Sequence, residues 1–225
     1  MNSAFFREKT MKKQGFFISL EGGEGCGKST QLQLLAQALQ KMEPEREIIA
    51  TRSPGGTPAA ERIRAVLKER IAGEDIAPET ELLLFGACHS QMVRTLITPA
   101  MERGAILITD RFFDSTIVYQ GIARKLGRTL IDEINAIACG DVKPDLTILL
   151  DIPTDVSFSR THTRDGNAVE ADRFDSENES FHTAIRQGFL ALAAEEKDRF
   201  AIVDATGDVD TVHKKIMEVV RGRLA

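Results

Sequence analysis

Cysteine is scarce in this chain, and its spacing excludes two classes of site. The 225 residues contain three cysteines, Cys26, Cys88 and Cys139. Because the number is odd and the intervals are wide, the pattern matches neither a disulfide framework nor a C-x-x-C metal site. We therefore expect reduced thiols and a protein of the reducing cytoplasm.

Long apolar runs and an excess of basic residues are also missing. No stretch approaches the roughly 18 apolar residues of a membrane span, and residues 1–14 lack the apolar run of a signal peptide. The formal net charge of −5 gives no basic field for a nucleic acid backbone. We expect a cytoplasmic protein that binds neither a membrane nor a nucleic acid polymer. Residues 1–14 are expected to form a disordered extension, or their first ten residues precede a start at Met11.

What the sequence does contain is a phosphate-loop motif. Gly22-Gly23-Glu24-Gly25-Cys26-Gly27-Lys28-Ser29 fits the pattern G-x-x-x-x-G-K-[ST]. An apolar run precedes it and a helical pattern follows it, which is the context that separates a phosphate loop from a chance glycine turn. Such a loop points backbone N–H groups at phosphate oxygens, with Lys28 reaching the terminal phosphates and Ser29 available to Mg²⁺. Cys26 is either a small loop residue or a target for electrophiles.

Hydrophobic periodicity predicts an α/β fold. Continuous apolar runs such as 105–108 and 146–150 are typical of strands that helices cover on both faces. The predicted strands are 16–20, 47–51, 105–110, 146–151 and 200–204, and the predicted helices are 30–42, 58–71, 78–103, 114–125, 129–139, 154–160, 177–197 and 209–224. Their alternation predicts one doubly wound domain over residues 15–225, with a five-stranded parallel sheet wrapped by helices.

Ligands of such folds bind beyond the carboxyl ends of the strands, so the residues after each strand are the functional candidates. The second predicted strand runs into Arg52-Ser53-Pro54-Gly55-Gly56-Thr57, which is either a plain turn or part of a site. In the next helix, either Arg62 or Arg64 can face the cleft. The third strand ends in Asp110-Arg111, where the acid can hold Mg²⁺ and the arginine can bind phosphate; the alternative is a surface ion pair.

Two further segments supply aromatic and polar candidates. Tyr119, the only tyrosine, and Gln120 carry groups that suit a sugar and a base, although alone they are only part of a polar helix start. In the helix 78–103, Phe85 has the spacing of a core residue, and Gly86 beside it leaves room for a planar base. His89 follows on the same face, where a structural histidine is the simpler interpretation.

Residues 160–178 form the least regular predicted segment, a charged surface loop between two helices. Its arginines are Arg160, Arg164 and Arg173. A loop of this kind is either simply solvated or, in a phosphoryl transferase, a mobile lid that closes over the phosphates and excludes water.

Taken together, these residues resemble bacterial thymidylate kinases, which make dTDP from dTMP and ATP. The resemblance extends from about residue 16 to the C-terminus and rests on several motifs in the right order and spacing. These are Leu20-Glu21-Gly22-Gly23-Glu24-Gly25-Cys26-Gly27-Lys28-Ser29-Thr30, Thr51-Arg52-Ser53-Pro54-Gly55-Gly56-Thr57, Asp110-Arg111-Phe112-Phe113-Asp114-Ser115-Thr116 and Tyr119-Gln120-Gly121. The resemblance implies a P-loop NTPase fold of the nucleoside monophosphate kinase type with a lid, ATP and Mg²⁺ as cofactors, and a homodimer.

The resemblance also implies a role for each matching residue. Arg64 and Arg111 would hold the monophosphate, Phe85 would stack on thymine and Tyr119 would pack on deoxyribose. The residues implied for ATP are Gly22, Gly23, Glu24, Gly25, Cys26, Gly27, Lys28, Ser29 and Thr30, and those for the metal are Ser29 and Asp110. The residues implied for dTMP are Glu24, Arg52, Pro54, Arg64, Phe85, His89, Arg111, Thr116, Tyr119 and Gln120. Those implied for catalysis are Lys28, Arg111, Arg160, Arg164 and Arg173, because a phosphate loop without arginine resembles the subgroup that supplies the catalytic arginine from the lid.

Two residues depart from the family pattern. The family usually has glutamate at Ser53 and arginine at His89, and that arginine hydrogen-bonds the base in relatives. Histidine is shorter and, with a reference pKa near 6.5, is mostly neutral at pH 7. Losing one base-directed hydrogen bond costs on the order of 1–3 kcal/mol if its partner stays buried and unpaired. Arg52 and Arg64 remain, so phosphate binding is expected to survive.

The leading hypothesis is Mg²⁺-dependent transfer of the ATP γ-phosphoryl group to a nucleoside monophosphate, with dTMP the preferred acceptor. The acceptor is already an oxyanion and needs no strong general base. One alternative is a related monophosphate kinase with a changed base preference. The other is a nucleotide-binding regulator without catalysis, although the N-K-x-D guanine motif of switch GTPases is absent.

Overall fold

The computed structural model describes residues 13–165 and 179–224. Its strands are β1 Phe16–Glu21, β2 Ile48–Arg52, β3 Ile106–Asp110, β4 Leu146–Asp151 and β5 Phe200–Asp204. Its α-helices are α1 Lys28–Met42, α2 Pro58–Lys68, α3 Pro78–Met92, α4 Thr98–Arg103, α5 Phe113–Thr116, α6 Arg128–Cys139, α7 Thr154–Asp165, α8 Glu179–Glu195 and α9 Val209–Leu224, and two π-helical segments are η1 Val93–Ile97 and η2 Ile117–Ala123. The expected disordered extension over residues 1–14 falls almost entirely outside the described residues.

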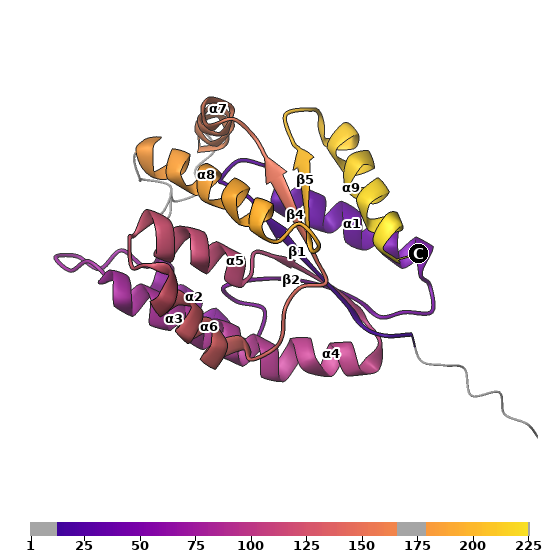
Figure 1. The fold of residues 1–225 in the computed structure, drawn as a ribbon, viewed down its shortest axis with the longest axis horizontal. Coiled ribbons are helices and arrows are strands. Elements are labelled where there is room, and N and C mark those ends of the chain that lie inside the picture. Colours follow the sequence, from indigo (N-terminus) through magenta and orange to yellow (C-terminus); the bar gives the residue numbers. More distant parts are fainter. Residues whose placement is uncertain (1–12, 166–178, 225) are drawn as a thin grey trace, which may run out of the picture.

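The predicted fold is confirmed. The five strands form one parallel sheet in the order β2-β3-β1-β4-β5, with helices on both faces (Figure 1). In the central pair, Leu20 of β1 lies opposite Asp110 of β3. This register brings the segments that follow β1 and β3 to the same edge of the sheet, where ligands of doubly wound folds bind.

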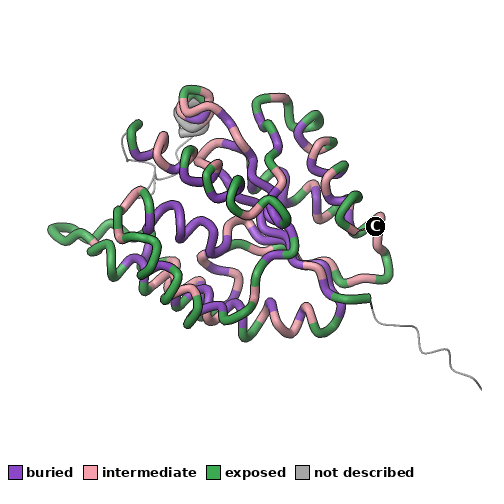
Figure 2. Tube along the Cα trace, in the orientation of Figure 1, coloured by how far each residue is buried: buried purple, intermediate pink, exposed green. Residues whose placement is uncertain are grey.

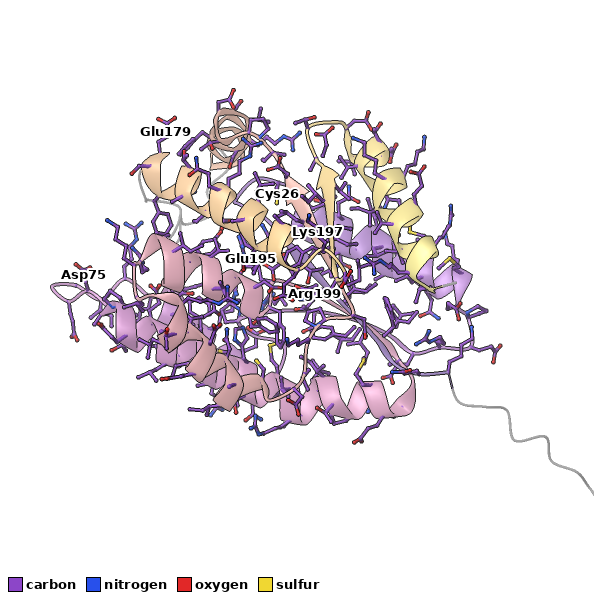
Figure 3. All side chains as sticks on the ribbon, in the orientation of Figure 1. Cys26, Asp75, Glu179, Glu195, Lys197 and Arg199 are labelled. Carbon is purple, nitrogen blue, oxygen red and sulfur yellow. The ribbon has the colours of Figure 1, made fainter. Side chains whose placement is uncertain are left out.

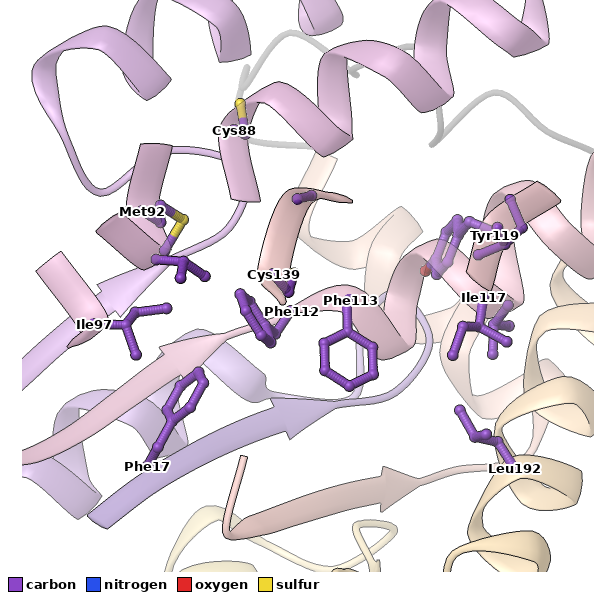
Figure 4. Close-up of a cluster of buried hydrophobic side chains, with 14 of the residues drawn as sticks. Phe17, Cys88, Met92, Ile97, Phe112, Phe113, Ile117, Tyr119, Cys139 and Leu192 are labelled. Carbon is purple, nitrogen blue, oxygen red and sulfur yellow. The ribbon is translucent and has the colours of Figure 1, made fainter. Parts of the chain in front are cut away.

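The two faces of the sheet carry separate apolar cores because side chains alternate along each strand. Phe17 and Leu107 point into the core beneath α3, α6 and α8, whereas Ile18 and Ile106 point into the core beneath α1 and α9. Figure 2 shows the central strands β1, β3 and β4 as buried, whereas the edge strands β2 and β5 are only partly so, and exposed residues lie on the outer sides of the helices. The larger core contains an aromatic row in which Phe112 lies 5.1 Å from Phe17 and 5.2 Å from Phe113, ring centre to ring centre (Figure 4).

The predicted helix 78–103 is interrupted by the π-helical segment η1. Thr98 donates its N–H to the carbonyl of Val93, five residues back, directly before Pro99. Proline has no N–H, and its ring clashes with the carbonyl four residues back in a regular α-helix. Widening the preceding turn relieves that clash and lets α4 continue.

Other predicted boundaries were also wrong. The helix predicted over 58–71 ends at Lys68, and the helix predicted to end at 197 ends at Glu195. The helix predicted over 114–125 begins at Phe113 and becomes π-helical from Ile117 to Ala123. The helix predicted to end at 160 continues to Asp165, because nothing before Gly166 breaks a helix. The first residues of the predicted lid loop are therefore helical, and 166–178 lie outside the described residues.

A buried ion pair fastens α5 to the turn before β5. Arg199 donates to both carboxylate oxygens of Asp114, at 2.6 and 2.7 Å, and to Thr147 and Glu196. Figure 3 shows Arg199 at this turn beside Glu195 and Lys197. Burial raises the pKa of the Asp114 carboxyl although Arg199 opposes the shift. The pair therefore contributes little net stability while intact, and breaking it leaves a buried charge without compensation.

No helix in the described part of the chain has the length and apolar character that crossing a membrane requires.

We predict that Asp114→Asn lowers the free energy of unfolding by about 3–5 kcal/mol, because Arg199 stays buried without its counter-ion. Denaturant unfolding measures this. The matched control is Asp132→Asn, which disrupts the half-exposed pair with Arg128 and is expected to cost less than about 1 kcal/mol. Equal costs for the two variants would show that the buried pair does not hold α5.

Candidate active site

The phosphate loop joins β1 to α1 at the carboxyl edge of the sheet. Gly22 has φ 139°, and a Cβ there would lie 2.5 Å from the carbonyl oxygen of Leu150. Gly27 precedes α1 with φ 91°. Both positions therefore require glycine, and the chain enters α1 with its first N–H groups turned to the loop.

Lys28 is held inside this loop. Its side chain is buried, and Nζ donates to the carbonyl oxygens of Gly23 at 2.7 Å and Gly22 at 3.2 Å. Nζ also lies 3.4 Å from Sγ of Cys26. All three cysteines are free and buried, which agrees with the expected thiols.

Ser29 and Asp110 meet at the start of α1. The Ser29 hydroxyl donates to Oδ2 of Asp110 at 2.8 Å, so the two predicted metal ligands come from separate segments to one point. A hydroxyl and a carboxylate are hard oxygen donors of the kind that Mg²⁺ uses together with phosphate oxygens and water. The pair therefore fits the expected ion. Among the described residues, no group of three or more His, Cys, Asp or Glu side chains could hold a metal alone.

Arg111 and Glu24 form an ion pair over the phosphate loop. Nη2 of Arg111 donates to Oε1 of Glu24 at 2.6 Å, and the Tyr119 hydroxyl donates to the same oxygen at 3.0 Å. Burial alone would raise the pKa of Glu24, but Arg111 and then Lys28 lower it to about 2. The Arg111 guanidinium also lies 4.9 Å from the centre of the Tyr119 ring. Two residues predicted for the acceptor are thus locked to the phosphate loop.

Glu21, at the end of β1, is a buried carboxylate that the sequence did not assign to the site. It accepts hydrogen bonds from the Phe112 N–H at 2.7 Å and from the hydroxyls of Ser115 at 2.6 Å and Ser19 at 2.8 Å. Burial and repulsion from Asp114 raise its pKa to about 7. The sequence around this glutamate carries no local signal for its contacts with Phe112 and Ser115, which lie 91 and 94 residues away in the chain.

A cleft of about 530 Å³ opens at this edge of the sheet. It is lined by all ten residues predicted for the acceptor, by Lys28, Arg160, Ser29 and Asp110, and by Gly25, Gly27 and Thr30 of the phosphate loop. Gly22, Gly23 and Cys26 do not line it. The cleft also has lining residues that were not predicted: Leu67, Lys68, Phe112 and Ser115, together with Ser53.

One side of the cleft carries arginines on and beside the β2–α2 loop. Nη2 of Arg52 donates to Oε2 of Glu61 at 2.9 Å, while Oε1 of Glu61 accepts the Gly56 N–H. Nη1 of Arg64 donates to the Pro54 carbonyl at 2.8 Å. Of the two arginines considered in α2, Arg64 lines the cleft and Arg62 does not. Glu61 therefore links Arg52, at the end of β2, to the loop that follows it.

Another part of the lining is uncharged, and we call Ser53, Phe85, His89, Thr116 and Gln120 the uncharged lining. Three of its buried polar atoms, Ser53 Oγ, His89 Nδ1 and Thr116 Oγ1, have no hydrogen-bond partner among the described residues. Burial lowers the pKa of His89 to about 4, so the ring is neutral at pH 7. These residues can bind an uncharged planar group that carries donors and acceptors.

Gln120 is held from behind by a buried acid. Its Nε2 donates to Oε1 of Glu81 at 2.7 Å, and Glu81 is almost fully buried. An ionised carboxylate only accepts hydrogen bonds. Glu81 therefore binds the NH₂ end of the Gln120 amide and not its oxygen.

Arg160, predicted as both the last residue of the helix 154–160 and the first of the lid segment, lies on helix α7, which continues to Asp165. It donates to the carbonyls of Ala205 and Thr206, each at 3.0 Å, and so links α7 to the segment after β5 while lining the cleft. Arg164 lies on the same helix, with its side chain outside the described part, and Arg173 lies outside the described residues.

Comparisons with known proteins agree on one family. The sequence model described as thymidylate kinase matches residues 20–216. The chain is 44% identical over 215 residues to a thymidylate kinase of Geobacter sulfurreducens, covering 93% of this chain and 98% of that one. It is also 44% identical over 214 residues to one of Rhodopseudomonas palustris, covering 94% and 90%. The crystal structure of thymidylate kinase from Ehrlichia chaffeensis matches with a TM-score of 0.74 and 29% identity, over 92% of this chain and 99% of that one.

The lowered pKa of His89 predicts a pH-dependent stability. In the unfolded chain His89 binds a proton below its ordinary pKa of about 6.5, whereas in the folded chain it stays neutral down to about pH 4. Stability therefore falls as pH drops through this window. Between pH 7 and pH 5 this single group should cost about 2 kcal/mol.

The test is denaturant unfolding at both pH values for the wild type and for His89→Gln, which cannot titrate. Other groups titrate alike in the two proteins, so the difference between them isolates His89. If both lose the same stability on acidification, the His89 ring is not held neutral by burial.

Proposed function

Because the chain belongs to the thymidylate kinase family, we propose that its cleft binds ATP and dTMP side by side and transfers the γ-phosphoryl group between them. The chain is an ATP-dependent kinase of dTMP, and the reaction yields dTDP and ADP. The observation that supports this use of the cleft is its lining, which joins the phosphate-loop lysine, four arginines and an uncharged set of side chains in one cavity.

The phosphate loop would bind the ATP phosphates. Its N–H groups and Lys28 face the same cleft, and Lys28 exchanges the carbonyls of Gly22 and Gly23 for phosphate oxygens when ATP binds. Ser29 and Asp110 would hold Mg²⁺, which supplies positive charge next to the phosphates when bound. Thr30 completes this end of the lining.

Arg111, Arg52 and Arg64 would bind the dTMP phosphate. A phosphate oxygen of dTMP forms the new bond to the γ-phosphorus, while the bond from that phosphorus to the bridging oxygen breaks and its electron pair stays on ADP. The attacking oxygen is already anionic, so no residue has to remove a proton. The arginines and Lys28 position the two phosphates and offset their mutual repulsion.

The uncharged lining would bind thymine. Phe85 offers a ring face, and Ser53, His89, Thr116 and Gln120 offer hydrogen-bonding groups without net charge. Tyr119, held by Glu24 at 3.0 Å, would pack on the deoxyribose. A neutral His89 can donate to or accept from a base, so an uncharged ring takes the place of the charged arginine that the family usually has at this position.

The arginines of residues 160–178 would add positive charge next to the phosphoryl group during its transfer. The phosphate loop has no arginine, and Arg160 already lines the cleft. Arg164 and Arg173 lie further along the same segment, which we propose to act as the lid that excludes water.

We also propose a homodimer in the cytoplasm. The adjoining helices α2, α3 and α6 (Figure 1) expose large apolar residues: Val66 at 44%, Leu83 at 57%, Leu130 at 37% and Ile137 at 73%. Exposed apolar patches of this kind support a protein interface. The free, buried thiols support a reducing compartment.

The acceptor preference tests the function. In a coupled ADP-release assay with dTMP, dUMP, dGMP, dCMP and AMP, we expect the highest kcat/KM with dTMP. Lys28→Ala should lower kcat by at least about 100-fold, because it removes a cation that stabilises the transferring group. Lys41→Ala, an exposed lysine at the other end of α1, should stay within about twofold. A better acceptor than dTMP would refute the substrate, and an active Lys28→Ala would refute the mechanism.

The oligomeric state tests the interface. The chain has a mass of 24.8 kDa, and light scattering should give twice this value for the wild type. Ile137→Glu places a charge in the proposed interface and should give the monomer mass. Ile202→Glu, equally apolar and 53% exposed on the edge strand β5, should leave the dimer intact. A monomeric wild type, or a dimer that persists in the Ile137→Glu variant, would contradict this interface.

A further inference from the structure

One buried carboxylate beside the site has no part in the reaction described so far. Glu21 is fully buried and does not line the cleft, yet its hydrogen bonds lead to the turn that carries Arg111. We propose that Glu21 is a positioning residue: through Ser115 and the Phe112 backbone, it fixes the Arg111 guanidinium that receives the acceptor phosphate. This inference rests on the proposed function, since it takes Arg111 as a ligand of the monophosphate.

The backbone of Arg111 is in an unusual conformation that needs support. Its φ is 70°, in the left-handed region that residues with a Cβ adopt at a cost. Three bonds surround it: the Arg111 N–H to the Leu20 carbonyl at 3.0 Å, the Thr109 hydroxyl to the Arg111 carbonyl at 2.9 Å, and the Phe112 N–H to Glu21 at 2.7 Å. The only side chain from outside β3 in this set is Glu21.

The side chain of Arg111 is reached through Ser115. Oε2 of Glu21 accepts the Ser115 hydroxyl at 2.6 Å, and Nη1 of Arg111 donates to the same serine oxygen at 3.1 Å. An ionised carboxylate has no proton to donate, so the Ser115 hydroxyl must donate its single proton to Glu21. The lone pairs of the serine oxygen are then left for Arg111. Because a guanidinium only donates, what Glu21 sets is the orientation of the Ser115 hydroxyl, which it holds with the lone pairs of the oxygen available to Arg111.

The other contacts of Arg111 show why this bond matters. Nη1 also donates to the Gly22 carbonyl at 2.9 Å and Nη2 to Glu24 at 2.6 Å. Both of these partners belong to the phosphate loop. The bond to Ser115 joins the guanidinium to α5, outside the phosphate loop, where the Tyr119 ring 4.9 Å away is a further contact. Losing it lets the guanidinium follow the phosphate loop, away from an acceptor phosphate.

Two serines donate to Glu21 and provide a matched pair of variants. Ser19 and Ser115 each give it one hydroxyl bond, at 2.8 and 2.6 Å, and both are buried. Only Ser115 stands between Glu21 and Arg111. A merely structural role of Glu21 predicts similar effects of Ser19→Ala and Ser115→Ala, whereas positioning predicts different effects on the acceptor.

The experiment is steady-state kinetics at pH 8, where Glu21 with a pKa of about 7 is mostly ionised, together with thermal melting. We expect Ser115→Ala and Glu21→Gln to raise the KM for the monophosphate about tenfold, with the KM for ATP within about twofold. Ser19→Ala should leave both constants within about twofold. Equal effects of the two serine variants, or an equal rise in the KM for ATP, would overturn the proposal.

A double-mutant cycle excludes a direct contact between Ser115, which lines the cleft, and the substrate. If Ser115 acts through Arg111, adding Ser115→Ala to Arg111→Ala causes no further loss; if it binds substrate itself, the losses multiply. The serine pair and the cycle remain decisive if Glu21→Gln does not fold. Wild-type turnover of dTMP tests the proposed function separately, and the variants are compared on whichever monophosphate the wild type uses best.

Discussion

The site depends on the parallel pairing of β1 with β3. This pairing sets Leu20 opposite Asp110, and the hydrogen bond from the Arg111 N–H to the Leu20 carbonyl continues it past the end of the strand. The phosphate loop therefore begins after β1 at the same edge of the sheet where Asp110 ends β3 and Arg111 follows it. A one-residue shift would turn every side chain of a strand to the opposite face, so this register is a condition for Ser29 to meet Asp110 and for Glu24 to meet Arg111.

Buried charges near this pairing act on geometry more than on stability. Glu21 and Asp114 are both fully buried, and burial raises the pKa of each. Replacing such groups with apolar residues is often neutral or stabilising in proteins, so stability does not account for their presence. What they supply is direction, because a carboxylate only accepts hydrogen bonds: Glu21 orients donors around the turn that carries Arg111, and Asp114 orients Arg199 and Thr147.

The sequence was a good guide where the signal is local and a poor one where it is not. The phosphate loop and the strand ends were predictable because glycine spacing and apolar runs report directly on local structure, and the order of motifs pointed to the family. The π-helical segment before Pro99 was in principle predictable from that proline. The contacts of Glu21 with Phe112 and Ser115 were not, because they join segments about 90 residues apart. Nor could the sequence show that the helix continues past Arg160 to Asp165, or that Arg160 bonds the carbonyls after β5, since charge and composition there resemble a loop.

The departure at His89 becomes intelligible once its surroundings are known. The sequence indicated only that histidine is mostly neutral at pH 7, whereas burial lowers the pKa to about 4 and makes the ring neutral throughout the physiological range. Together with Ser53 and Thr116, it leaves buried polar atoms without partners among the described residues. Such atoms cost free energy, on the order of 1–3 kcal/mol each, until a ligand pairs with them. A base that satisfied all three would gain more than a base that satisfied two, so in the proposed function the uncharged lining would select by hydrogen-bond complementarity, while the arginines of the same cleft would bind any monophosphate alike.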